Sequence, residues 1–236
     1  MGGHWQRPDS RVRIHVFDSF NRGFVISGPP IGVLGGSFDP VHCGHLHLAK
    51  EAYNAAGLSE VRFVPLNVPA HKQSSATGTA DKCDMLRTVM VPPFVLDLVE
   101  IERGGVSYTI DTLKQLRSAF PGRPLCLVLG KDAFIHLASW KDYQQLLDFC
   151  HLVVVARAEA EEQIPDELAL IIKDGVVDER DDLHNNLSGK VFFVDAPLVE
   201  ISSSNVREKL LQKQSIEGLV PDSVLDIINN KGLYRV

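Results

Sequence analysis

A glycine pair followed by two histidines is the part of the sequence best suited to chemistry. Gly35 and Gly36 end an apolar run, and His42 and His45 follow them with Gly44 in between. Glycines at a strand end let a phosphate approach the backbone, and the N-terminus of a following helix offers free N–H groups to an anion. Residues three apart on a helical turn face the same side, so both imidazoles could donate hydrogen bonds to a phosphate in transfer. The pattern predicts a nucleotide-phosphate site.

Other interpretations explain less of this segment. A glycine pair after a strand is usually a turn, and a single histidine is usually structural or exposed. Paired histidines can bind metal, but the His-x-x-x-His spacing with an intervening glutamate is absent. The GxGxxG dinucleotide fingerprint and the GxxxxGKS/T loop of P-loop NTPases are also missing. A phosphate site accounts for the glycines, the turn, the helix start and both histidines together.

The elements that must position this segment alternate between short β-rich apolar runs and runs of helical period. Strands are predicted at 31–35, 61–65, 94–98, 125–130, 152–156 and 191–195. Helices are predicted at 44–56, 81–90, 109–120 and 142–149, the last one capped by Asp142. This alternation predicts an α/β fold with a doubly wound parallel sheet and right-handed crossovers. Ligands in such a fold sit at the carboxyl ends of the strands.

The two ends of the chain differ from this pattern. Residues 1–30 lack helical or strand periodicity and close with Gly-Pro-Pro, so we predict a poorly ordered leader without chemistry. A single domain is then expected at 31–236. Its last part, about 201–236, is expected to be a small helical portion with helices at 204–212 and 223–230.

Two internal stretches are predicted as loops. Residues 66–80 hold Pro69, Gly78 and a cluster of serine and threonine, which suits a mobile flap. Residues 158–189 contain ten acidic residues against only Lys173 and Arg180. That charge favours a solvated connection around a surface helix at 164–172.

Composition bounds the partners. The chain has 236 residues and a net charge of −6, which gives no general basic surface for nucleic acid or an anionic membrane. Its four cysteines lie far apart and form no CxxC pair, so neither a disulfide framework nor a zinc site is predicted. No run approaches the ~20 apolar residues needed to cross a bilayer, and charged residues interrupt 1–30 too often for a secretory signal. We expect a cytoplasmic protein with reduced thiols, whose oligomeric state the sequence does not indicate.

Several motifs resemble a known family. GSFDPVHCGH, from Gly36 to His45, resembles the HxGH signature of a nucleotidyltransferase superfamily with a Rossmann-like fold. Its members include adenylyltransferases for nicotinate mononucleotide, nicotinamide mononucleotide and phosphopantetheine, as well as cytidylyltransferases. ISSSNVR, from Ile201 to Arg207, resembles the superfamily's second ATP signature, ISSTxIR, with Ser204 where threonine is commoner.

Three further segments and the end of the chain resemble the bacterial nicotinate-nucleotide adenylyltransferases. PAHK at 69–72 resembles their PPHK, with Ala70 in place of the second proline, and SYTIDTL at 107–113 resembles their SYTxDTL. Gly130-Lys131-Asp132 followed by Trp140 resembles their GxD…W pairing, and 219–235 matches their usual ending. The similarity runs in order from about residue 31 to the end of the chain.

The resemblance implies a role for each candidate residue. Catalytic roles fall to His42, His45, Lys72 and Arg207. ATP binding falls to Gly35, Gly36, Ser37, Phe38, His42, His45, Gly130, Asp132, Ile201, Ser202, Ser203 and Arg207. Acceptor binding falls to Lys72, Tyr108, Thr109 and Trp140.

These roles have physical reasons, and each has an ordinary alternative. Lys72 could neutralise phosphate charge, although a loop lysine is often simply solvated. Thr109, near a helix start, could hold a carboxylate or an amide or serve as a cap. Trp140 could stack on a cationic pyridinium ring or pack in the core. Asp132 could accept hydrogen bonds from a ribose or cap a helix, and Arg207 could bind the outer phosphates of ATP or lie on the surface.

The implied reaction is ATP plus nicotinate mononucleotide giving deamido-NAD and pyrophosphate in NAD biosynthesis. The acceptor phosphate attacks the α-phosphorus in line and is already an anion, so positioning and charge stabilisation suffice. Mg²⁺ is expected to arrive on the triphosphate, without a dedicated metal site in the protein. Nicotinamide mononucleotide or phosphopantetheine as acceptor, and a non-catalytic nucleotide sensor, stay open as alternatives. No single residue decides between nicotinate and nicotinamide.

Overall fold

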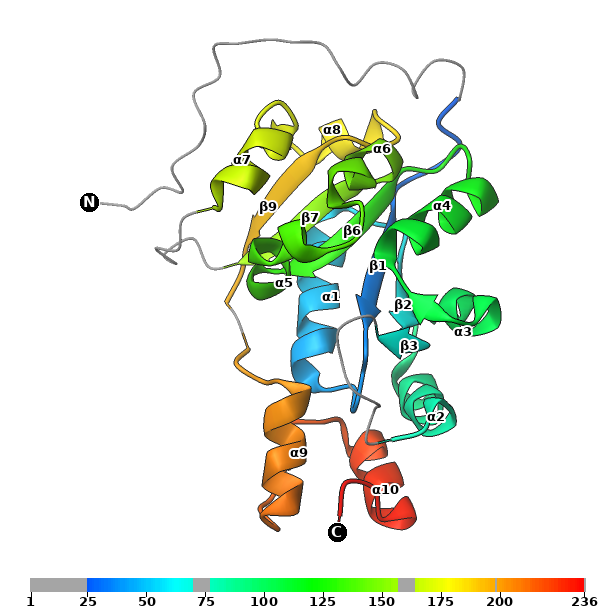
Figure 1. Cartoon of the computed structure of the whole chain (residues 1–236), viewed down its shortest axis with the longest axis vertical. Helices are drawn as coiled ribbons and strands as arrows, with labels where there is room; N and C mark the ends of the chain where they lie inside the picture. Colours follow the sequence, from blue (N-terminus) through cyan, green and yellow to red (C-terminus); the bar gives the residue numbers. More distant parts are fainter. Residues whose placement is uncertain (1–24, 70–76, 157–163, 198, 236) are drawn as a thin grey trace, which may run out of the picture.

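The computed structural model describes residues 25–69, 77–156, 164–197 and 199–235. A seven-stranded parallel sheet in the order β4–β2–β1–β6–β7–β9–β8 forms its centre, and β3 pairs with β5 in a separate two-stranded sheet (Figure 1). The strands are β1 (Ile31–Gly36), β2 (Glu60–Pro65), β3 (Val68–Pro69), β4 (Phe94–Leu96), β5 (Val106–Ser107), β6 (Leu125–Gly130), β7 (His151–Ala156), β8 (Val176–Val177) and β9 (Val191–Asp195). The predicted α/β Rossmann-like fold is confirmed.

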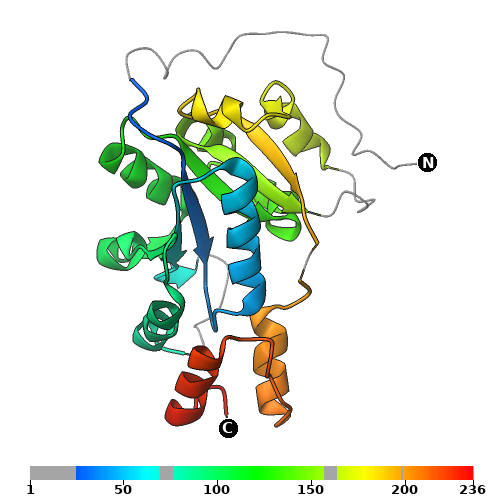
Figure 2. The same cartoon turned by 180° about the vertical axis from the view of Figure 1, so that it is seen from behind.

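Helices cover both faces of the sheet, and each face has its own apolar core (Figures 1 and 2). The α-helices are α1 (Cys43–Ala56), α2 (Thr79–Val89), α3 (Val99–Arg103), α4 (Thr109–Ala119), α5 (Lys131–Ile135), α6 (Leu146–Phe149), α7 (Asp166–Ile172), α8 (Asp181–His184), α9 (Ser203–Leu211) and α10 (Asp222–Lys231). Alanines of α1 pack with α9 and α10 in one core, and leucines of α4 pack with α5, α6 and α7 in the other. All six residues of β7 are buried, as expected for a parallel strand covered on both faces.

The order of the strands reverses beside β1. The chain proceeds from β1 to β2 and β4 on one side, then returns to place β6, β7 and β9 on the other. In doubly wound sheets, the carboxyl ends of the two strands at such a switch point open a crevice. The carboxyl ends of β1 and β6 are Gly36 and Gly130, two of the glycines that the sequence assigned to ATP binding.

The small helical portion lies beyond the carboxyl ends of the strands (Figures 1 and 2). Its two helices, α9 and α10, match the predicted helices at 204–212 and 223–230 within two residues. Lys231 on α10 pairs with Asp81 and Asp84 on α2 at 2.6 and 2.8 Å. These contacts join the end of the chain to the helix that follows the predicted flap.

Several sequence predictions were wrong in detail. The helix predicted at 142–149 is a 3-10 turn (Tyr143–Gln145) followed by the single turn of α6, and Asp142, which precedes the 3-10 turn, makes no side-chain cap hydrogen bond. Asp142 has φ of 51°, a left-handed conformation, whereas a capping aspartate adopts an extended one.

The acidic stretch is also more structured than predicted. Its surface helix is present as α7, but β8 extends the sheet beside β9, and Leu183 on α8 is buried. Residues 158–163 lie outside the described residues.

The chain before β1 is described from residue 25 onward, so most of the predicted leader, 1–24, lies outside the described residues. Ser27 donates a backbone hydrogen bond to Gly122 at 2.8 Å, and Arg123 donates to the carbonyl of Pro29. Residues 27–29 therefore rest on the turn that precedes β6. Within the described residues, no helix is both long enough and apolar enough to cross a bilayer.

Candidate active site

The two histidines lie together at the start of α1. Their rings stack with centroids 3.6 Å apart and 26° between the planes. Phe38, fully buried beneath them, meets the ring of His45 edge-on at 4.9 Å. Phe38 itself has φ of 45°, an uncommon conformation for an aromatic residue, which the tight loop between β1 and α1 imposes.

Burial keeps both imidazoles neutral. It lowers the pKa of His42 to about 4, and burial together with the neighbouring His42 lowers the pKa of His45 well below its usual value. The backbone N–H of His42 donates to Nδ1 of His45 at 3.3 Å, so the proton of the neutral His45 ring lies on Nε2. Nδ1 of His42 is buried without a hydrogen-bond partner among the described residues. The pair offers neutral N–H donors rather than positive charge.

Two glycines of the motif have different structural roles. A Cβ on Gly44 would lie 3.0 Å from Nδ1 of His42 and 3.3 Å from the carbonyl oxygen of Ile201, so the close packing of these groups requires glycine. A Cβ on Gly35 would meet nothing within 4 Å. Gly35 faces open space where a ligand could approach the backbone.

A cavity of about 630 Å³ opens beside the histidines. It is bounded by the starts of α1, α5 and α9, whose N-cap residues are His42, Gly130 and Ser202. Helix starts present unpaired N–H groups and positive dipole ends, which favour an anion such as a triphosphate. Candidate ATP residues that line this cavity are Gly35, His42, His45, Gly130, Asp132, Ile201 and Ser202.

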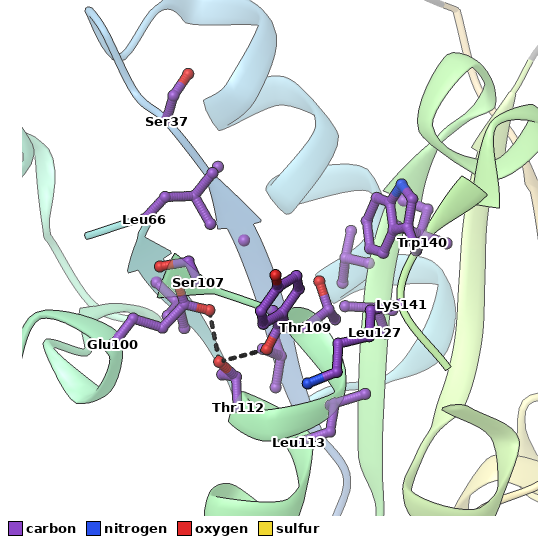
Figure 3. A pocket seen from close by; sticks show the side chains of 17 residues that line it. Ser37, Leu66, Glu100, Ser107, Thr109, Thr112, Leu113, Leu127, Trp140 and Lys141 are labelled. Atoms are coloured by element: carbon purple, nitrogen blue, oxygen red, sulfur yellow. Dashed lines mark hydrogen bonds between the residues drawn. The ribbon is translucent and has the colours of Figure 1, made fainter. Parts of the chain in front are cut away.

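A second cavity, of about 290 Å³, lies between β1, β6 and the start of α4 (Figure 3). The candidate acceptor residues Tyr108, Thr109 and Trp140 all line it. Gly35, Val128, Leu129 and Trp140 line both cavities. The arrangement can therefore place two ligands side by side across the carboxyl end of β1.

A buried carboxylate lies in this second cavity. Oε1 of Glu100 accepts a hydrogen bond of 2.5 Å from the hydroxyl of Thr112 (Figure 3). The same hydroxyl accepts hydrogen bonds of 3.2 Å from Arg103. Oε2 of Glu100 is buried with no hydrogen-bond partner among the described residues. The hydroxyl of Thr112, a residue in the first turn of α4, thus links Glu100 to the guanidinium of Arg103.

Some candidate residues lie behind the cavities rather than in them. Arg207 donates to the carbonyl of Asp39 at 2.7 Å and to the hydroxyl of Ser204, and Ser203 donates to the carbonyl of Pro40 at 2.9 Å. In this structure, both side chains hold the loop that carries the histidines. Gly36 lines the smaller cavity, as does Ser37, which the sequence placed with ATP. Lys72 and the rest of PAHK from Ala70 onward lie outside the described residues.

The chain is similar to proteins of a known family over most of its length. The sequence model of the family described as "Cytidylyltransferase-like" matches residues 33–209. A protein of Aeromonas salmonicida named "Probable nicotinate-nucleotide adenylyltransferase" is 38% identical over 208 residues, covering 87% of this chain and 97% of the relative. A protein of the same name from Trichlorobacter lovleyi is 38% identical over 214 residues, covering 87% and 99%. The chain belongs to the nicotinate-nucleotide adenylyltransferase family.

Solved structures agree on the fold of this nucleotidyltransferase family. The nicotinic acid mononucleotide adenylyltransferase of Plasmodium falciparum, solved in complex with NaAD, superposes with a TM-score of 0.68 at 20% identity, covering 88% of this chain and 98% of that one. A protein of Vibrio parahaemolyticus described as a nicotinate-nucleotide adenylyltransferase superposes with a TM-score of 0.58 at 14% identity. At these identities the likeness shows the shared fold.

Sequence reasoning missed several residues that line the cavities of this adenylyltransferase-family chain. Lys131 and Asn205 lie within motifs quoted from the sequence and Lys141 directly follows Trp140, but none of the three was given a role. Glu100 had no signal because the short helix α3, which carries it, was not predicted.

Proposed function

We propose that this protein transfers the AMP moiety of ATP to nicotinate mononucleotide, forming deamido-NAD and pyrophosphate in NAD biosynthesis. The observation that carries the proposal is the pair of cavities that meet at Gly35, with the stacked histidines on one side and Trp140 between them. A reaction that joins two nucleotides needs two adjoining sites. The names of the relatives at 38% identity support nicotinate mononucleotide as the acceptor.

ATP would lie in the larger cavity, with its phosphates towards the starts of α1 and α9. The Nε2–H of His45 would donate to an oxygen of the α- or β-phosphate, where negative charge grows in the transition state. A neutral donor is suited to this role because it binds the phosphate without a proton having to be gained or lost. Arg207 and Lys72 would add positive charge when the nucleotide is bound.

The acceptor would lie in the smaller cavity. The face of Trp140 would contact the pyridinium ring, a favourable cation–π arrangement, and Thr109 at the start of α4 would approach the ring substituent. The acceptor phosphate, already ionised at neutral pH, would attack the α-phosphorus in line and release pyrophosphate.

Mg²⁺ would arrive with the triphosphate and neutralise part of its charge. Among the described residues, no group of three or more histidines, cysteines or carboxylates could hold a metal ion. The chemistry of the larger cavity, which is rich in N–H donors, fits an ion bound mainly through phosphate oxygens and water.

The remaining expectations complete the proposal. We infer one catalytic domain at 31–236, a leader at 1–30 that takes no part in the reaction, and a cytoplasmic protein without nucleic-acid or membrane partners. The net charge of −6 supports the absence of nucleic-acid and membrane partners, because the composition gives no general excess of basic residues.

An acceptor panel tests the proposal directly. The protein is incubated with ATP, Mg²⁺ and either nicotinate mononucleotide, nicotinamide mononucleotide or phosphopantetheine, while pyrophosphate release and the mass of the product are measured. Deamido-NAD is the expected main product. ATP binding without pyrophosphate release would instead indicate a nucleotide sensor, and a phosphopantetheine product would indicate another branch of the superfamily.

His45→Ala tests the mechanism, with an expected fall in kcat of at least about 100-fold. His184→Gln is the matched control, since His184 contacts the other end of α1 through the carbonyl of Ala56. Full activity of the His45→Ala enzyme would contradict the assignment of the histidine pair.

A further inference from the structure

One basic side chain reaches the acceptor cavity beside Trp140. Nζ of Lys141 lies 4.3 Å from the centroid of the Tyr108 ring and 3.6 Å from Oδ2 of Asp111 (Figure 3 shows Lys141 in the cavity wall). Tyr108 is the N-cap residue of α4, and Asp111 lies in its first turn. The ammonium group is therefore held at the start of this helix.

The start of α4 is already the positive end of a helix. Its first N–H groups have no partners within the helix, and the helix dipole adds a partial positive charge there. Lys141 contributes a full positive charge to the same place. Among the lining residues that the structure describes, Lys141 alone is basic and Glu100 alone is acidic.

The two charges act at different points of the cavity. Glu100 lies on α3, and the hydroxyl of Thr112 joins it to Arg103. Lys141 lies next to Trp140, close to the ring of Tyr108. Its counter-charge, Asp111, accepts no closer contact than 3.6 Å, and the lysine side chain is 45% exposed, so the ammonium is incompletely neutralised.

Nicotinate and nicotinamide differ mainly in charge at one substituent. The ring of nicotinate mononucleotide carries a pyridinium cation and a carboxylate anion, whereas the ring of nicotinamide mononucleotide carries the cation with a neutral amide. A nearby ammonium attracts the carboxylate, but it repels a pyridinium that has no carboxylate to compensate. A cation beside the ring therefore discriminates between two acceptors of almost the same shape.

We propose that Lys141 is a specificity-determining residue that favours the carboxylate of nicotinate over the carboxamide of nicotinamide. This inference rests on the proposed function and deepens it. It assigns the choice of acceptor, which the sequence left open, to a side chain outside the SYTIDTL motif and directly after Trp140.

Lys141→Met tests the inference through the ratio of two acceptors. The value of kcat/KM for nicotinate mononucleotide is expected to fall about fivefold, mainly through KM, since a partly exposed charge contributes modestly. The value for nicotinamide mononucleotide is expected to stay unchanged or to rise, and KM for ATP to stay constant. Lys141→Arg should restore most of the preference, and the preference of the unmodified enzyme should weaken in 1 M salt.

Two further variants separate charge from packing. Asp111→Asn frees Lys141 from its counter-charge and is expected to raise the preference for nicotinate in the presence of Lys141, but much less in the Lys141→Met background. Lys114→Met is the matched control, because Lys114 also lies over an aromatic ring, that of Phe149, but lines neither cavity.

The outcomes distinguish the two proposals. An unmodified enzyme that fails to produce deamido-NAD would overturn the proposed function. An unmodified enzyme that uses nicotinate mononucleotide, together with a Lys141→Met variant of unchanged acceptor ratio, would overturn only the role of Lys141. An equal fall for both acceptors, matched by a lower Tm, would show a packing role and would also overturn it.

Discussion

The hydroxyl of Tyr234 donates a hydrogen bond of 2.7 Å to Oδ1 of Asp39, a residue 195 positions earlier in the chain. Arg207 donates to the carbonyl of the same aspartate. Helix α1 is tied to the C-terminal portion as well, since the backbone N–H of Cys43 donates to the carbonyl of Leu219 at 2.9 Å. The loop that carries the histidines is therefore positioned by residues from the end of the chain.

Replacing Tyr234 with phenylalanine should loosen this loop while keeping the aromatic ring. We expect the free energy of unfolding to fall by about 1–2 kcal/mol, because a partly buried hydrogen bond to a carboxylate is lost. We also expect kcat to fall several-fold, because this loop leads into the histidine pair. Urea denaturation and steady-state kinetics measure the two effects. Tyr143→Phe, which alters an exposed hydroxyl, is the control, and unchanged kcat in Tyr234→Phe would refute the positioning role.

Alanine at the two motif glycines should affect different properties, stability and kcat at Gly44 and KM at Gly35. Gly44→Ala places a methyl group 3.0 Å from the His42 ring and 3.3 Å from the backbone of Ile201, so we expect lost stability of about 1–3 kcal/mol and lower kcat. Gly35→Ala meets nothing within 4 Å in the free protein, so its Tm should stay nearly constant. Its KM should rise for both substrates because the methyl group enters the space that both cavities share. A fall in Tm in Gly35→Ala as large as that in Gly44→Ala would contradict this difference between the two glycines.

Stability should depend on pH through the buried histidines. The folded-state pKa of His42 is about 4, against 6.5 for an ordinary histidine, because burial disfavours the charged form. Between these values the unfolded chain binds more protons than the folded one, so the free energy of unfolding falls as pH decreases from 6.5 to 4. His42 alone should contribute a loss of about 3 kcal/mol over this window. Above pH 6.5 its effect disappears.

The His42→Asn variant isolates this contribution. Urea denaturation at pH 7 and at pH 4.5 should show a smaller acid-induced loss in the variant than in the unmodified protein. His151, which is also buried with a pKa lowered to about 4, remains in both proteins and contributes equally. Identical losses in the two proteins would refute the prediction.

Thr112→Val should disconnect the charges around the acceptor cavity. The substitution keeps the shape of the side chain but removes the hydroxyl between Glu100 and Arg103, so Oε1 of the buried carboxylate loses this donor. We expect a loss of about 1–3 kcal/mol in the free energy of unfolding and a higher KM for the acceptor. Thr112→Ser retains the hydroxyl and should behave like the unmodified protein. Equal Tm values for the valine and serine variants would contradict the expectation.

The sequence predicted what depends on local pattern. All six proposed strands are present, and the histidine motif runs from the end of β1 into the first turn of α1 as its spacing indicated. Asp142 was misjudged because a capping residue is recognised by type, while residue type does not indicate the left-handed conformation that Asp142 adopts in its turn. β8 was missed because a two-residue strand gains its place from pairing with β9 rather than from its own composition.

Long-range contacts explain what local patterns did not indicate. Nothing in the sequence indicated that Arg207, which is proposed to bind the phosphates of ATP, also contacts the backbone of Asp39, a contact between residues 168 positions apart. The position of Lys141 depends on how the segment that follows β6 packs against the start of α4. No spacing rule connects such positions, because they meet only when the sheet has assembled.

The shared wall at Gly35, Leu129 and Trp140 has a consequence for the end of the catalytic cycle. A dinucleotide formed across this wall keeps its adenosine half in one chamber and its pyridine half in the other. Neither ATP nor the acceptor mononucleotide occupies both chambers in this way. The dinucleotide can therefore dissociate only when both of its halves leave their chambers. We therefore expect dissociation of the dinucleotide, rather than bond formation, to be the rate-limiting step.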